Sequence, residues 1–227
     1  MTSEQYRGGG LVLEKGTHDP ILGTPQDFLA PEFMDLSMYL RCIENQGHEP
    51  WCAAYAGCCV GQAVAWKQTN VPRDFDEEAL YLNSKSRDGL PPDTPGTTER
   101  AMLEAALDMG VLPAGTTWCA VPSYNAMRFA LHKYGWVVGG FKLHENWQPN
   151  HMLPGGIIQN SPRLEYMGAH EVVIVGYTST GDVVITNSWG QRWGSNGYGT
   201  MSGWSFQQDW LGGRAIVIPD NNRETSG

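Results

Sequence analysis

Apolar residues fill nearly every position from Ala53 to Lys67. A segment that is apolar all round is typical of a helix buried in the core rather than one on the surface. Pro50 suits the first helical position, because its φ fits a helix and its missing N–H would have no intrahelical partner. The pattern therefore predicts a buried helix with Cys52 in its first turn.

Two further helices are predicted before the middle of the chain, over residues 75–86 and 98–109. In the second, apolar residues recur at helical spacing and Gly110 provides a stop. A short helix is also predicted over residues 125–134. The first half of the chain is thus expected to be mainly helical.

The second half carries β-branched and aromatic runs that predict strands. Ser179 to Asp182 forms a turn-like stretch between two of these runs, which indicates a hairpin with His170 and Asn187 on neighbouring strands. The predicted strands cover residues 136–143, 172–175, 183–186, 198–202 and 214–218. An antiparallel sheet is therefore expected in this half.

Three polar residues within these elements suggest nucleophilic catalysis. The unpaired N–H groups and the dipole at a helix start stabilise a thiolate, the attacking form of Cys52. A histidine such as His170 can take the thiol proton, and the amide of Asn187 can fix the imidazole orientation. Each of these residues alone would more often be structural, so the combination carries the prediction.

The chain resembles the papain-like cysteine peptidases over about residues 33–218. Gln46, six residues before Cys52, matches the oxyanion-hole glutamine of that family. His170 matches its base, and Asn187 opens an Asn-Ser-Trp-Gly run that matches its orienting asparagine. A Trp-Gly-x-x-Gly-Tyr segment follows at residues 193–198, and four anchors in family order are a specific signal.

This resemblance implies an α+β papain-like fold, in which a helical subdomain and an antiparallel, β-barrel-like subdomain enclose the cleft. We expect an extended arm over residues 1–32 and a catalytic domain over 33–218, followed by a tail over 219–227. Within the domain, residues 33–122 are expected to be mainly helical and 123–218 mainly β.

The same resemblance assigns supporting roles to two residues. Trp189 is expected to shield the contact between His170 and Asn187 from water. Gly96 is expected where relatives pair their backbone with substrate, although the usual Cys-x-Gly-Gly context is missing. Pro50-Trp51 before the nucleophile and Ala53 after it depart from the best-known members, which indicates an altered cleft wall.

The arm contains three consecutive glycines and several prolines, which favour an extended segment. It is much shorter than the helical propeptide of typical family members, so we expect that it is not an inhibitor of that kind.

Net charge and leader signals narrow the possible partners and location. The net charge of −9 argues against nucleic-acid binding and against adhesion to anionic membranes. We expect a peptide or protein substrate, no cofactor and no metal, and the sequence does not indicate an oligomeric state. Because no leader or membrane-spanning run is present, a cytoplasmic or particle-associated location is favoured over classical secretion.

Two other functions remain open from the sequence. The chain could be a thiol amidase or acyl transferase acting on cell wall or isopeptide bonds, since scaffold does not fix substrate. It could also be a binding or structural protein with a papain-like fold, although retention of Gln46, Cys52, His170 and Asn187 argues against that.

Overall fold

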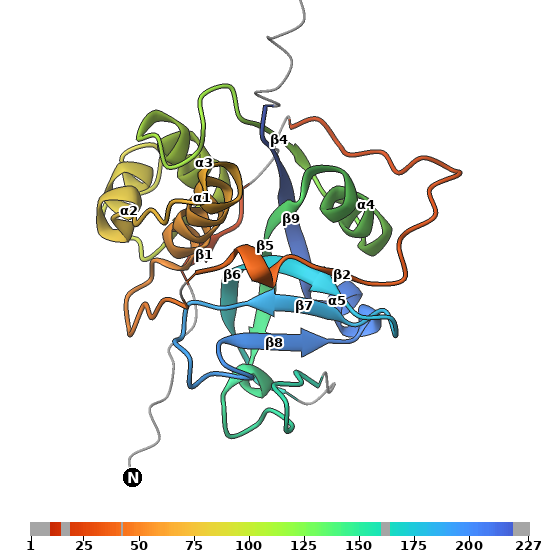
Figure 1. Cartoon of the computed structure of the whole chain (residues 1–227). Helices are drawn as coiled ribbons and strands as arrows, with labels where there is room; N and C mark the ends of the chain where they lie inside the picture. Colours follow the sequence, from red (N-terminus) through yellow and green to blue (C-terminus); the bar gives the residue numbers. More distant parts are fainter. Residues whose placement is uncertain (1–9, 15–18, 42, 160–163, 220–227) are drawn as a thin grey trace, which may run out of the picture.

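The computed structural model describes residues 10–14, 19–41, 43–159 and 164–219. Cys42, residues 1–9 of the predicted arm and all but Pro219 of the predicted tail lie outside the described residues. Helices α1 (Cys52–Thr69), α2 (Glu77–Lys85) and α3 (Glu99–Asp108) gather on one side of the molecule, and a large sheet occupies the other (Figure 1). The structure thus confirms a mixed helical and antiparallel fold.

Helix α1 begins at the candidate nucleophile itself. Trp51 is its N-cap residue, so Cys52 occupies the first helical position and Pro50 lies just outside the helix. The placement of Pro50 at the first helical position was therefore wrong, while the prediction of Cys52 in the first turn is confirmed. The helix ends at Asn70, whose left-handed conformation (φ 55°) closes the last turn. As predicted, most of its residues are buried.

Side-chain caps fix the starts of the other helices. Asp76 accepts a hydrogen bond from the Ala79 N–H at the start of α2, and Thr98 accepts one from the Ala101 N–H at the start of α3. Such caps satisfy N–H groups that have no intrahelical partner. Both helices lie within the predicted ranges.

The main sheet is antiparallel throughout, in the order β4-β9-β5-β6-β7-β8, with β2 also paired to β6. The predicted hairpin is confirmed, because β6 pairs with β7 directly. The strand bounds are β2 (Met34–Asp35), β4 (Thr117–Ala120), β5 (Trp136–His144), β6 (Tyr166–Tyr177), β7 (Val183–Thr186), β8 (Tyr198–Met201) and β9 (Trp210–Val217).

The sequence analysis predicted some of the remaining elements and missed others. Helix α4 (Tyr124–Tyr134) was predicted, whereas α5 (Gly203–Asp209) and strands β2 and β4 were not. Strand β4 carries no buried face that would reveal it, and α5 is two turns held by a Ser202 cap. Two 3₁₀ turns, η1 (Ser37–Tyr39) and η2 (Glu145–Trp147), also occur.

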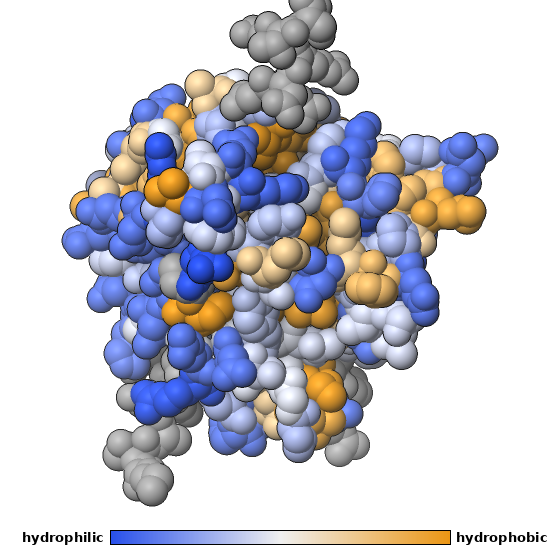
Figure 2. Space-filling view, viewed as in Figure 1, coloured by the Kyte–Doolittle hydropathy of each residue, from blue (hydrophilic) through white to orange (hydrophobic). Residues whose placement is uncertain are grey.

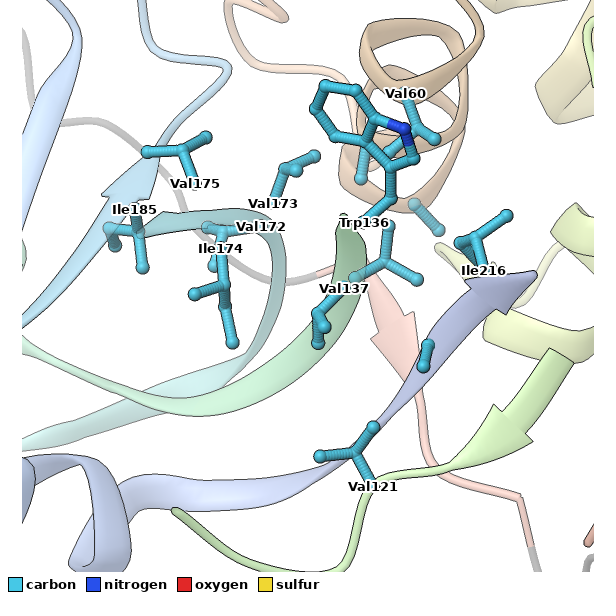
Figure 3. Close-up of a cluster of buried hydrophobic side chains, with 14 of the residues drawn as sticks. Val60, Val121, Trp136, Val137, Val172, Val173, Ile174, Val175, Ile185 and Ile216 are labelled. Carbon is cyan, nitrogen blue, oxygen red and sulfur yellow. The ribbon is translucent and has the colours of Figure 1, made fainter. Parts of the chain in front are cut away.

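One apolar core joins the helices to the sheet. Trp136 at the start of β5 lies beside Val60 of α1, and the valines and isoleucines of β6 and β7 continue the cluster (Figure 3). On the face shown in Figure 2, hydrophobic residues form small separate patches among hydrophilic ones. Among the described residues, no helix is long and apolar enough to cross a membrane. The core holds α1 firmly against β6, the strand that carries His170.

Candidate active site

Cys52 is completely buried at the start of α1. Burial raises the pKa of this thiol to about 12, and the Glu171 carboxylate adds to the rise. The backbone N–H groups of Glu171, Ala53 and Cys52 lower the pKa in part, because N–H dipoles near the sulfur favour the thiolate. Because Glu171 directly follows His170, the sulfur lies beside the backbone of the strand that carries the candidate base.

His170 and Asn187 are joined by a buried hydrogen bond. The His170 Nε2 and Asn187 Oδ1 atoms are 2.8 Å apart. An amide oxygen can only accept, so Nε2 carries the proton and Nδ1 is left as the basic nitrogen of a neutral ring. Within the described part of the chain, His170 Nδ1 has no hydrogen-bond partner. The β6–β7 hairpin thus fixes the imidazole tautomer.

Two tryptophans enclose the His170 ring. Trp189 lies over it with ring centroids 4.8 Å apart, and the Trp147 ring meets it edge-on at 6.0 Å. Both indoles are fully buried. Sequence analysis singled out Trp189 but missed Trp147, which lies in the short turn η2 outside any motif. Both indoles thus pack against the ring that forms the hydrogen bond to Asn187.

Ser188 orients the side chain of Gln46. The Ser188 hydroxyl donates to Gln46 Oε1 at 2.5 Å, and Gln46 Nε2 donates to the Glu49 carbonyl at 2.7 Å. The backbone N–H of Gln46 also donates to the Ser188 carbonyl. Gln46 is therefore fixed to the loop that follows Asn187, with one amide N–H left for another acceptor. Ser188 was quoted within the Asn-Ser-Trp-Gly run, but its contact with Gln46 was not foreseen.

Burial favours neutral forms of both candidate catalytic groups. It lowers the pKa of His170 to about 4, although the hydrogen bond to Asn187 opposes the change. With the Cys52 pKa at about 12, a neutral thiol and a neutral imidazole prevail at pH 7. The thiolate and imidazolium pair expected from the sequence is therefore disfavoured in this conformation.

The N-terminal arm covers this site. Strand β1 (Leu11–Val12) runs parallel to β3 (Thr97–Thr98), and the Gly10 carbonyl accepts a hydrogen bond from the Thr97 N–H at 2.9 Å. The Gly10 N–H donates to the Ala169 carbonyl at 3.3 Å. Leu11 packs with Cys52 and Ala169 in one small apolar cluster. The arm thus bridges β3 and the strand of His170 beside Cys52.

Gly96 allows this crossing. It has a φ of +83°, and a Cβ added there would lie 2.1 Å from the Gly10 carbonyl oxygen. Any other residue would displace the arm backbone. The residue predicted to pair with substrate therefore lies beneath the arm, in contact with an extended segment of this same chain.

Of the described arm residues, Gly10 and Leu11 are engaged with the site. The prediction that the arm would not act as an inhibitory propeptide was based only on its short length. Two backbone hydrogen bonds and the side chain of Leu11 suffice to cover Cys52 without any helix.

Elsewhere in the described residues, Glu44, Asp74 and Glu77 bring three carboxylates within 4.8 Å of one another. Burial and the neighbouring carboxylates raise the pKa of Glu77. This group does not include any candidate catalytic residue.

Comparisons with known proteins agree with the architecture. The family described as "Papain family cysteine protease" matches residues 97–207. Cathepsin J of Mus musculus is 45% identical over 236 aligned positions, which cover 87% of this chain and 69% of that protein.

Solved structures share the fold at low identity. Xylellain, a cysteine protease from Xylella fastidiosa, superposes with a TM-score of 0.79 at 20% identity, covering 95% of this chain and 98% of the other. Digestive procathepsin L 3 of Tenebrio molitor gives 0.69 at 16% identity, covering 93% and 76%. A recombinant stem bromelain precursor gives 0.72 at 16% identity, covering 95% and 78%.

Proposed function

Because the chain belongs to the papain family of cysteine proteases, we propose that it hydrolyses peptide bonds with Cys52 as nucleophile, His170 as acid and base, and Asn187 as orienting residue. The observation that carries the proposal is the bond between His170 Nε2 and Asn187 Oδ1, which leaves Nδ1 unprotonated. An unprotonated Nδ1 can take the proton of a thiol.

The reaction requires that residues 10–11 leave the cleft. Water then reaches Cys52 and His170, and the desolvation that opposes their charged forms is relieved. The proton passes from the thiol to Nδ1, and the thiolate attacks the scissile carbonyl. His170 then protonates the leaving amine, and water hydrolyses the thioester.

Gln46 is proposed to stabilise the oxyanion. One N–H of its amide is held by the Glu49 carbonyl, and the second remains for the developing negative charge, together with the Cys52 backbone N–H. A single donor of this kind is worth about 3 to 4 kcal/mol in other hydrolases. Ser188, which fixes the amide oxygen, acts as a positioning residue.

Peptide cleavage tests this proposal. Fluorogenic peptides are incubated with the full chain under reducing conditions, with and without an epoxide thiol inhibitor. We expect cleavage that the inhibitor abolishes, and a loss of at least about a thousandfold in kcat/KM for Cys52→Ser. Cys119→Ser is the matched control, because Cys119 is a half-buried free thiol on β4. Equal activity of the two variants, or no cleavage of any peptide, would refute the assignment.

A further inference from the structure

Among the described residues beside the covered nucleophile, carboxylates outnumber guanidinium groups. Arg214 on β9 contacts Glu14 (2.7 Å), Asp19 (2.7 Å) and Glu99 (2.9 Å). Its side chain is only 7% exposed. Two of the three carboxylates belong to the arm and one belongs to α3, so departure of the arm would remove most of the partners of a buried guanidinium.

Arg100 on α3 forms a second attachment for the same arm residues. Its side chain bonds Asp19 at 2.5 Å, and its backbone N–H donates to Glu14 Oε1 at 2.7 Å. The exposed Glu104 lies 3.8 Å from the guanidinium. Arg100 and Arg214 together hold the arm by the side chains of Glu14 and Asp19.

Glu171 is a fourth carboxylate at this site, and no described residue forms an ion pair with it. It is 1% exposed, and neither of its carboxylate oxygens has a hydrogen-bond partner among the described residues. A Cβ added at Gly140 would lie 2.2 Å from Leu11 Cδ2 and 3.8 Å from Glu171 Oε2, so the Leu11 side chain and this carboxylate lie on the same side of β5. The apolar Leu11 side chain offers Glu171 no hydrogen-bond partner.

We propose that Arg100 and Arg214 form a receptor for an acidic peptide segment, filled here by Glu14 and Asp19, and that filling it requires Glu99 and Glu171 to take up protons. With the arm in place, four carboxylates share two guanidinium groups in a buried site. Without it, Glu99 and Glu171 balance Arg100 and Arg214. Excess negative charge at low dielectric is relieved by proton binding.

The titration of the two carboxylates agrees with this charge count. Burial raises the pKa of Glu99 to about 7, with Arg214 opposing the rise and Glu14 adding to it. Burial also raises the pKa of Glu171 well above its ordinary value, with Glu99 and Glu14 adding and Arg214 opposing. The arm therefore increases the proton affinity of both groups.

Other titratable groups near Glu171 do not supply a missing positive charge. The Cys52 thiol on α1 is neutral, and its own pKa is raised in part by Glu171. His170, adjacent on β6, is held neutral by burial. The groups that remain are those of the receptor and the arm, so proton uptake is what can neutralise Glu171.

The direction of the pH dependence follows from linkage. Groups whose pKa is higher with the arm bound favour the bound arm at low pH, and this advantage is lost as pH rises through their raised pKa values. His170, whose pKa is lowered by burial, opposes this trend by one proton, and Glu99 and Glu171 outweigh it with two. The arm is therefore held more firmly near pH 5 than near pH 8. Each proton taken up contributes up to a tenfold change in the binding equilibrium per pH unit.

Amide hydrogen exchange measures arm binding without reference to peptide cleavage. The Thr97 N–H donates to Gly10 and the Arg100 N–H donates to Glu14, so both amides report whether the arm is bound. After correction for intrinsic exchange, we expect their protection in the full chain to fall at least tenfold from pH 5 to pH 8. Constant or rising protection would overturn the proposal.

Three variants test the residues involved. Glu171→Gln keeps the shape of the side chain but cannot lose a proton. Between pH 5 and pH 8, the logarithm of the protection factor should therefore fall by no more than half as much as in the wild-type chain. Glu14→Gln removes an arm charge and should lower protection at pH 5 and flatten the profile, and it lies outside the folded core. Glu78→Gln, at an exposed site on α2, should keep the wild-type profile. Wild-type profiles in both of the first two variants would refute the proposal.

Discussion

Leu11 of the arm and the candidate nucleophile Cys52 lie in one small buried apolar cluster, together with Ala169. The contact is apolar, whereas the arm is held further along by Glu14 and Asp19 on Arg214. The same short segment thus contributes an apolar residue beside Cys52 and the acidic residues that bind Arg214. Activity should consequently depend on residues that take no part in the chemistry.

Leu11→Ala is expected to raise activity. The substitution removes most of the apolar contact with Cys52 and Ala169, and losing a buried leucine side chain costs about 2 kcal/mol or more where the contact is complete. A shift of that size in the arm equilibrium would increase kcat/KM about tenfold or more if the bound arm limits turnover. Fluorogenic peptide hydrolysis by the full chain provides the measurement.

The control for this prediction is Leu13→Ala. Leu13 is in the same arm but 50% exposed, so its truncation should change kcat/KM little. Equal increases in both variants would indicate a general loosening of the arm rather than a cover formed by Leu11.

The ionisation of the Cys52 thiol should also depend on whether the arm is bound. Burial holds the pKa of Cys52 at about 12 while Leu11 is in place. Exposure in Leu11→Ala should lower this pKa, because desolvation is the largest cause of the shift. The rate of Cys52 alkylation by iodoacetamide, followed by peptide mass mapping between pH 5 and 9, should therefore rise at lower pH in the variant. Identical profiles in the two proteins would contradict this account.

Sequence patterns predicted the parts of the site that depend on local structure. Cys52 could be placed at a helix start because the run after it is apolar, and the turn before Val183 paired the strands of His170 and Asn187. By contrast, Leu11 and Cys52 are brought together from segments that are distant in the sequence. The arm is positioned by two backbone hydrogen bonds of Gly10, and such bonds leave no side-chain pattern in the sequence. Trp147 likewise approaches His170 only through the packing of η2.

Ser188→Ala should impair catalysis without unfolding the protein. The Ser188 hydroxyl is the donor that holds Gln46 Oε1, and a hydrogen bond of this kind contributes about 1 kcal/mol. A less well-oriented Gln46 amide should lower kcat about tenfold at most while KM changes little. Ser195→Ala, at an exposed position in the following loop, is the matched control. A change in KM with an unchanged kcat would exclude the positioning role of Ser188.

Arg214→Gln should destabilise the fold itself. The guanidinium is nearly buried and bonded to Glu14, Asp19 and Glu99, so its removal leaves uncompensated carboxylates. Breaking a buried ion pair by removing one partner costs about 3 to 5 kcal/mol. Urea denaturation at pH 7 should show this loss, and it should shrink at pH 5 because protonation of Glu99, whose pKa is raised to about 7, lessens the unpaired charge. Arg87→Gln, whose partner Asp108 is 60% exposed, should cost no more than about 1 kcal/mol, and equal losses for the two arginines would contradict the buried role of Arg214.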